Sequence, residues 1–354
     1  MKTAVLAVTL LGALTGVAQA QSTVQVYGSL DSGVIKRSGQ SLSVGKRQAN
    51  TLGLRGAEEL GAGLRALFHL EIRYESDTGL LEYGGNGLQR PFLQGQSRVG
   101  LAGDFGTLRL GRGLTSFQEI SMAFEPFHGI PSPSGFQSDM MVGGGYSSDP
   151  LGLPGNSATR FSNALFYSSP EFLGMQLNLT IGSREANGNA ALVGRGSPLA
   201  PQYPANAQAS ANPFSIASTY KNGPIALMLA HERNAVEHEV TAIAAYLWIS
   251  PETKLMASLS RQDQSHTRLA GQHTRAWVMG ANHTLGARKF LMGYGQTHTD
   301  SLARVKQLSL GLEYSLSKRT FIYADLSNKK GAPALAPGAA SSINHYSLGV
   351  HHAF

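Results

Sequence analysis

The chain has 354 residues, carries a formal net charge of +7 and contains no cysteine. The absence of cysteine excludes disulfide bonds, cysteine-ligated zinc and a cysteine nucleophile. Charged residues make up 14% of the chain and hydrophobic residues 42%, so composition alone does not separate a soluble β protein from a membrane barrel, and the pattern along the chain must decide.

The first twenty residues predict a secretory signal peptide. Lys2 supplies a positive charge, residues 4–17 are uncharged and mostly apolar, and Ala18-Gln19-Ala20 has the small-x-small pattern at which signal peptidase cuts. The apolar stretch is too short for a stable membrane span, and no other segment offers about 20 consecutive apolar residues. We therefore expect cleavage after Ala20 and a single mature domain over residues 21–354.

After residue 21 the chain alternates apolar and polar residues with a period of two, as β-strands with two unlike faces do. Along the segment 305–315, for example, Leu310 belongs to the apolar set and Ser309 to the polar set. In a barrel, Leu310 would face lipid, whereas Ser309 would face the lumen, where a charge should be tolerated. Sixteen such segments are predicted, with starts near residues 23, 47, 63, 94, 106, 159, 173, 212, 224, 239, 253, 273, 288, 305, 319 and 343.

Short and long connections take turns along the chain. Every second connection is a tight turn of Gly, Pro, Asn or Asp residues, such as Asn222-Gly223. Membrane barrels have short periplasmic turns and long extracellular loops, and an even strand number lets the sheet close without an unpaired edge. The fold class predicted is therefore all-β, a sixteen-stranded antiparallel transmembrane barrel. The longest connections are residues 76–92, 113–158, 185–211 and 328–342.

Several segments carry more specific motifs. They are Val24 to Asp31 (VQVYGSLD), Leu52 to Leu64 (LGLRGAEELGAGL), Val99 to Arg112 (VGLAGDFGTLRLGR), Ser162 to Pro170 (SNALFYSSP) and Leu348 to Phe354 (LGVHHAF). In this order, and over the whole mature chain, they resemble the trimeric general porins of Gram-negative bacteria, particularly the β-proteobacterial branch.

The resemblance implies a homotrimer of barrels in the outer membrane, each with its own water-filled pore for small hydrophilic solutes and ions. It implies contact with outer-membrane lipid and lipopolysaccharide. It also implies that the third extracellular loop, here between Arg112 and Arg160, folds inward and narrows the pore. Phe354 ends the chain in phase with the apolar positions of the last strand, and by the same resemblance it is a signal read by the barrel-insertion machinery.

In such pores, acidic groups on the inward loop face basic groups on the wall, and the resulting field orients solutes and biases ion choice. The loop offers Glu119, Glu125, Asp139 and Asp149. The alternation aims Arg55, Arg73, Arg98 and Arg109 into the lumen, with Arg160 alongside them and Arg112 near the base of the loop. The family usually carries Arg where this chain has Thr51, and often another near Gly95, so the basic ladder is altered. A weak preference for anions is expected.

Other functions have weaker support. Asp263 with His266, and His298 with Asp300, fall in predicted extracellular loops where barrel proteases place such groups, but polar loops form such pairs by chance. Neighbouring residues of a strand face opposite sides, so two successive histidines, as at 351 and 352, cannot converge on one metal ion from that strand alone. We therefore expect no enzymatic activity, no metal and no cofactor.

The lysine and arginine residues form no basic cluster, so no nucleic-acid partner is expected either. Two alternatives stay open beside the diffusion porin. A solute-specific outer-membrane channel would hold a saturable site for one ligand, and a secreted β-rich adhesin would have no pore.

Overall fold

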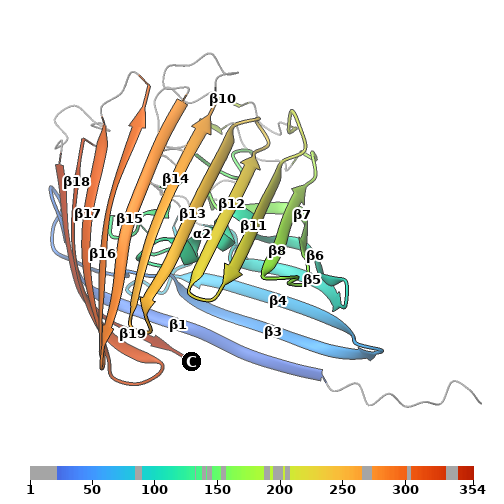
Figure 1. Ribbon diagram of the computed structural model, residues 1–354, viewed down its shortest axis with the longest axis horizontal. Helices are drawn as coiled ribbons and strands as arrows, with labels where there is room; N and C mark the ends of the chain where they lie inside the picture. Colours follow the sequence, from blue (N-terminus) through green and yellow to red (C-terminus); the bar gives the residue numbers. More distant parts are fainter. Residues whose placement is uncertain are drawn as a thin grey trace, which may run out of the picture.

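The computed structural model shows a barrel of tilted strands with a short helix inside it (Figure 1). Ala20, Asp139 and His266 lie outside the described residues. No helix of the described part is long and apolar enough to cross a membrane. The structure describes residues 22–83, 90–131, 133–137, 141, 146–152, 157–186, 192–193, 202–203, 208–264, 273–300, 304–331 and 342–354.

Sixteen long antiparallel strands form the barrel, which closes because β1 pairs with β3 along one edge and with β19 along the other. They are β1 (Ser22–Arg37), β3 (Asn50–Gly61), β4 (Leu64–Tyr74), β5 (Gln96–Gly103), β6 (Gly106–Leu114), β7 (Arg160–Ser168), β8 (Met175–Gly182), β11 (Phe214–Asn222), β12 (Ile225–Arg233), β13 (Glu239–Ser250), β14 (Thr253–Asp263), β15 (His273–Leu285), β16 (Arg288–Thr299), β17 (Val305–Ser315), β18 (Thr320–Lys330) and β19 (Ser342–Ala353). The shorter elements are β2 (Ser43–Gly45), which pairs with β1, the ribbon of β9 (Leu192–Val193) and β10 (Gln202–Tyr203), and the helices α2 (Ser116–Ser121) and η2 (Met122–Phe124).

The predicted fold class is confirmed, and each of the sixteen strands begins within three residues of its predicted start. The barrel is inverted relative to a soluble β protein. On β17, Leu310 is 42% exposed on the outer surface, whereas Ser309 is completely buried on the inner one. An outer surface of exposed leucine, valine and aromatic side chains is stable in lipid and would be costly in water.

The last residue extends the seam that closes the barrel between β1 and β19. The backbone N–H of Phe354 donates to the carbonyl oxygen of Gly28 at 3.0 Å, and the N–H of Gly28 donates back to Phe354 at 3.1 Å. A Cβ atom at Gly28 would lie 2.5 Å from the Phe354 ring, which explains why glycine occupies this position. Phe354 thus joins the first strand to the last one.

The connection between β6 and β7, called loop 3 below (residues 115–159), folds into the barrel. Its first turn forms α2, capped by the Thr115 hydroxyl, which accepts from the N–H of Gln118. The helix can be seen behind β12 and β13 in Figure 1. The sequence pattern did not predict this helix, because six residues are too few to show a helical periodicity.

Loop 3 packs against the inner face of β11, β12 and β13 through an apolar cluster. Its Phe117 and Phe124 meet small inward-facing residues of the wall, among them Ala226 and Ala242. A second cluster joins Phe136 of the loop to the inner face of β15 and β16. Further on, the side chain of Gln307 on β17 donates to the carbonyl oxygens of loop residues Pro133 and Gly135 at 2.7 and 3.0 Å.

The same contacts change one expectation. Ser309 faces inward as predicted, but it lies beneath loop 3, where its hydroxyl donates to Pro133 at 3.4 Å. A charge at this position would therefore meet the loop instead of water, so we no longer expect the tolerance that alternation alone predicts there.

Candidate functional site

A row of basic side chains crosses the inner wall opposite the surface that loop 3 covers. The register of β3, β4 and β5 places Arg55 beside His69, and His69 beside Arg98. Arg109 on β6 pairs with Gly100, the next inward position after Arg98. Cavities of about 480 and 680 Å³ open along this wall, and both are lined by Arg98, Arg109 and Glu119.

Arg55 is held by its neighbours on β1. Its Nε donates to the Gln25 side-chain oxygen at 2.9 Å, and its guanidinium lies 5.0 Å from the centre of the Tyr27 ring. The hydroxyl of Tyr27 in turn lies 2.5 Å from Nε2 of His69 and donates to Glu71 at 2.9 Å. These contacts fix the direction of the Arg55 side chain, although the residue stays exposed to the lumen.

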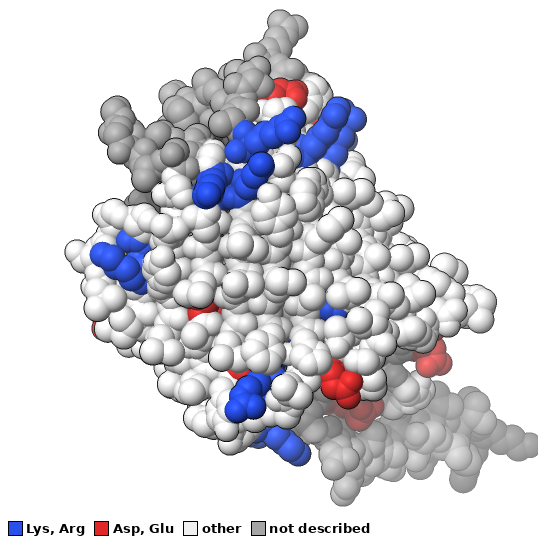
Figure 2. All heavy atoms as spheres, turned by 60° about the vertical axis from the view of Figure 1, so that its left-hand side comes forward, with Lys and Arg blue, Asp and Glu red and all other residues white. Residues whose placement is uncertain are grey.

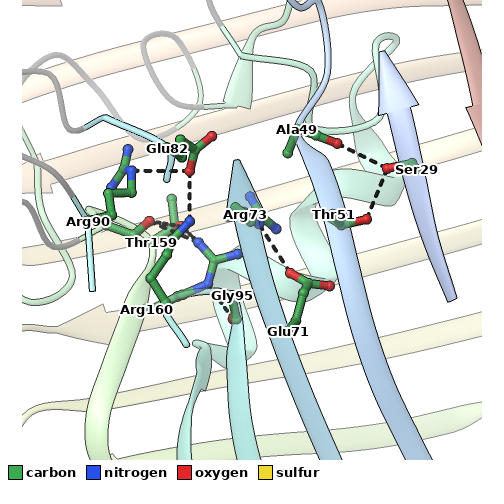
Figure 3. Close-up of polar contacts among 12 residues, drawn as sticks. Ser29, Ala49, Thr51, Glu71, Arg73, Glu82, Arg90, Gly95, Thr159 and Arg160 are labelled. Atoms are coloured by element: carbon green, nitrogen blue, oxygen red, sulfur yellow. Dashed lines mark hydrogen bonds and ion pairs between the residues drawn. The ribbon is translucent and has the colours of Figure 1, made fainter. Parts of the chain in front are cut away.

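Arg73 lies higher on the same wall and is partly neutralised. Its Nε lies 3.1 Å from Oε1 of Glu71, as Figure 3 shows. Above this pair, Glu82 binds both Arg90 and Lys46, at 3.1 and 2.9 Å. The upper wall is therefore a network of balanced charges rather than a purely basic surface.

Arg98 and Glu119 bring the wall and loop 3 together. Nη1 of Arg98 lies 3.8 Å from a carboxylate oxygen of Glu119 on α2, and its guanidinium lies over the Phe166 ring. The Arg98 side chain is almost completely buried, whereas that of Glu119 is 44% exposed. Arg109 makes no hydrogen bond or ion pair with the residues that the structure describes, so its charge acts directly on the lumen.

Two of the predicted basic residues brace the base of loop 3. Arg112 donates to the Ser162 hydroxyl at 2.5 Å and to the carbonyl oxygen of Gln94 at 3.3 Å. Arg160 is 2% exposed and donates to the carbonyl oxygen of Gly95 at 2.8 Å, a bond drawn in Figure 3. The register between β6 and β7 shifts at residues 111–113, so strict alternation no longer gives the direction of side chains there. Arg160 is therefore not exposed to the lumen, contrary to expectation.

Glu125 does not reach the lumen either. Its carboxylate is completely buried and accepts hydrogen bonds from the backbone N–H groups of Phe127 at 3.0 Å, Phe136 at 3.4 Å and Gly129. Burial raises the pKa of Glu125 to about 7, against the opposing effect of these three hydrogen bonds. Glu125 thus holds together backbone segments of loop 3 instead of contributing a charge to the lumen. Asp149 is half-buried at the loop base, close enough to Arg112 to attract its charge.

Sequence reasoning missed Tyr27 and His69, although both belong to the same inward-facing alternation as Arg55 and Arg73. It also missed Lys254 on β14, which donates to the carbonyl oxygen of Ala123 in loop 3 at 2.7 Å. At Thr51, where the resemblance led us to look for arginine, the hydroxyl contacts that of Ser29 at 3.0 Å (Figure 3). Thr51 itself adds no charge, and its directly opposed neighbour on β4 is Arg73, which is paired with Glu71. The cationic excess therefore lies lower, at Arg55 and Arg109.

Comparisons with known proteins agree with this architecture. A family model described as Gram-negative porin matches residues 7–332. Outer membrane porin protein 32 of Delftia acidovorans is 30% identical over the full length of both chains, and an outer membrane porin protein of Bordetella pertussis is 23% identical, also over both full lengths.

Solved structures give the same fold. An anion-selective porin from Comamonas acidovorans superposes with a TM-score of 0.70 at 23% identity, covering 94% of this chain and 100% of that one. The trimer form of the outer membrane protein OmpT of Vibrio cholerae superposes with a TM-score of 0.64 at 12% identity, covering 94% and 99% of the two chains.

Proposed function

Because the chain belongs to the Gram-negative porin family, and is thus a diffusion channel of the bacterial outer membrane, we propose that the basic wall of β3 to β6 gives its pore a weak preference for anions. The observation that carries this proposal is an excess of positive charge on the part of the inner wall that loop 3 leaves uncovered, β3 to β6, called the open wall below. Arg55, Arg73, Arg98 and Arg109 face two carboxylates, Glu71 and Glu119, each of which is already bound to one of those arginines.

The preference is modest for physical reasons. A unit charge about 8 Å from a passing ion contributes about 0.5 kcal/mol in water, or about a twofold change in relative permeability. At physiological salt the Debye length is also about 8 Å, so the effect grows in dilute salt and fades towards about 1 M. Two unpaired arginines can therefore bias the pore towards anions without excluding cations.

Conductance across a planar bilayer tests this proposal. In a potassium chloride gradient, the reversal potential of the wild-type protein should report anions as the more permeant species, with a larger effect in dilute salt. A reversal potential on the cation side would show that the loop carboxylates dominate. Conductance that saturates for one solute at low concentration would instead favour a solute-specific channel, and absence of conductance would favour a protein without a pore.

The active form we propose is a homotrimer. Support comes from the family and from the Vibrio cholerae structure, which is described as a trimer form. The mass of the detergent-solubilised protein by light scattering should equal three mature chains. A mass of one chain would contradict this assembly.

We further propose two steps of maturation. Cleavage after Ala20 should give a mature chain that begins at Gln21, which intact mass spectrometry of outer-membrane protein can check. Deletion of Phe354 should lower the assembled yield, because it removes the two backbone hydrogen bonds to Gly28 and the residue that the insertion machinery is expected to read. Unchanged assembly would reduce Phe354 to ordinary surface packing.

A further inference from the structure

Charged side chains gather at the end of the barrel with the tight turns. Figure 2 shows Lys, Arg and acidic side chains at the lower end of the outer surface formed by the later strands, below a broad band with few charges. At the ends of β3 to β8 next to the tight turns, the exposed residues include the carboxylates Glu58, Glu59, Asp104 and Glu171. The open wall, with its arginines, therefore stands directly above an acidic edge.

The cavity of about 680 Å³, called the lower recess below, lies between this edge and helix α2. Glu119 of α2 borders its upper end, while Asp104 in the β5–β6 turn and Glu171 in the β7–β8 turn border its lower end. The hydroxyl of Tyr167 donates to the carbonyl oxygen of Phe105 at 2.9 Å, which holds the first of these turns against β7. The two acidic turns are therefore neighbours below one cavity.

Charged side chains at opposite ends of the lower recess lack partners. The side chains of Arg109, Asp104 and Glu171 make no hydrogen bond or ion pair with the described residues. At the upper end, by contrast, Arg98 lies 3.8 Å from Glu119. The recess thus presents one unpaired cation on its wall and two unpaired carboxylates at its floor.

Asn178 on β8 adds an unused hydrogen-bond donor to the lining of the recess. This residue is 8% exposed, and its amide nitrogen has no hydrogen-bond partner in the described part of the chain. A buried donor without an acceptor costs free energy, which a ligand oxygen would recover. Ser168 pairs with both Thr107 and Asn178, so Asn178 lies at the level of Thr107, two residues below Arg109 on β6.

The strand geometry gives the spacing between the unlike charges. Arg109 lies three residues above Gly106, where the β5–β6 turn ends, so about 10 Å of strand separate them. Thr107, and with it Asn178, lies about 3 Å above the same turn. A carboxylate midway between Arg109 and Asn178 would therefore lie about 7 Å above the acidic edge.

We propose that the lower recess binds linear solutes that carry a carboxylate and an ammonium group about 7 Å apart, with the carboxylate at Arg109 and Asn178 and the ammonium group at Asp104 and Glu171. An extended chain gains about 3.5 Å for every three bonds, so the two charged ends of 6-aminohexanoate, six bonds apart, match this spacing. The charges of glycine, about 2.5 Å apart, cannot reach both ends of the recess.

Binding at this site is weak, as passage through a diffusion channel requires. An exposed ion pair strengthens binding by about fivefold at most, so a solute paired at both ends dwells in the recess and then moves on. The site depends on an open pore but not on the sign of its ion preference. The reversal potential measured without solute tests that preference separately, so either proposal can fail while the other holds.

The test measures how added solutes reduce the ion current of the full-length mature protein in a planar bilayer. For the wild type, 6-aminohexanoate should reach half-saturation at a concentration about threefold or more below that of glycine, hexanoate or hexylammonium. R109Q and D104N/E171Q should each raise the half-saturating concentration of 6-aminohexanoate about threefold. E58Q/E252Q, the matched control, removes two exposed carboxylates that do not line the recess and should stay within about 1.5-fold of wild type.

The probes with a single charge distinguish the two ends of the site. The half-saturating concentration of hexanoate should rise in R109Q and not in D104N/E171Q, and that of hexylammonium should rise in D104N/E171Q and not in R109Q. Equal responses of both probes to both variants would overturn the assignment of the two ends. Half-saturation by glycine at the same concentration as 6-aminohexanoate, or a loss in E58Q/E252Q as large as in D104N/E171Q, would overturn the site itself.

Discussion

The inner wall of the barrel has two unlike halves. On β3 to β6 its inward positions carry Arg55, His69, Arg98 and Arg109 beside an open cavity, with Arg98 itself buried against Glu119 and Phe166. On β11 to β13, and on β15 and β16, the equivalent positions hold small residues such as Ala226, Ala242 and Gly293, which loop 3 covers. Both halves follow the same alternation along their strands.

On the covered half, the small inward residues leave room for the aromatic side chains of the loop to pack against the wall. A Cβ atom at Gly293 would lie 2.4 Å from the Phe136 ring of loop 3, so even a methyl group there would displace the loop. With the loop held against this half, the open half lines the remaining space. Its charges are the ones that permeating ions meet.

The largest effect expected from this comparison concerns a new charge on each half. Ser309→Arg on the covered half should destabilise the protein by about 1–3 kcal/mol, or displace loop 3 and enlarge the conductance, because the position is completely buried under Pro133. Thermal unfolding and single-channel conductance measure the two outcomes.

The matched variant is Ala57→Arg on β3, at a half-buried position that lines a cavity of the open half. It should fold with stability within about 0.5 kcal/mol of wild type and lower the conductance by narrowing the lumen. If Ser309→Arg proved as well tolerated as Ala57→Arg, loop 3 would not cover β17.

A loss of similar size, without displacement of the loop, is expected from the hydrogen bonds that hold the loop. Gln307→Met keeps the approximate shape of a completely buried side chain but leaves the carbonyl oxygen of Gly135 without its donor, at a cost of about 1–3 kcal/mol. Gln25→Met on the open half, where the side chain is exposed, should change the free energy of unfolding by less than about 0.5 kcal/mol. Equal losses in the two variants would remove the distinction between the halves.

The pH dependence of stability should identify the buried carboxyl of loop 3. The folded protein raises the pKa of Glu125 to about 7, so it binds this proton more tightly than the unfolded chain does. The resulting stabilisation is complete below the ordinary pKa of a glutamate and is lost as the pH rises through about 7. Glu125→Gln should remove this slope, which is at most about 1.4 kcal/mol per pH unit.

Glu119→Gln is the control for that experiment, since its side chain is 44% exposed, and it should keep the wild-type slope. Thermal unfolding measured between about pH 5 and pH 8 compares the three proteins. A slope that persists in Glu125→Gln would show that another group is responsible.

Sequence periodicity predicted the strands well because each strand has one face towards lipid and one towards the interior. Positions such as Leu310 and Ser309 differ in polarity for that reason alone, and the pattern survives along every strand. The same rule put Arg55, Arg73, Arg98 and Arg109 on the inner face, where the structure places them.

Strand alternation did not predict the side-chain positions in loop 3, which folds into the barrel, or at the base of that loop. The completely buried Glu125 depends on three backbone donors that only the folded loop brings together. The side chain of Arg160 turns to the backbone of Gly95 next to a register shift that has no signature in the alternation. Such contacts join residues far apart in the chain, and local pattern does not contain them.

The effect that separates the two halves most directly is small, and it is visible in the reversal potential. Arg109→Gln removes an unpaired cation from the open half, whereas Lys254→Gln removes a cation that is 6% exposed beneath loop 3 and already bonded to Ala123. In a dilute potassium chloride gradient, Arg109→Gln should lower the relative permeability of chloride by about twofold, and Lys254→Gln should leave it unchanged. An equal shift in both variants, or a shift in Lys254→Gln alone, would contradict the assignment of ion preference to the open wall.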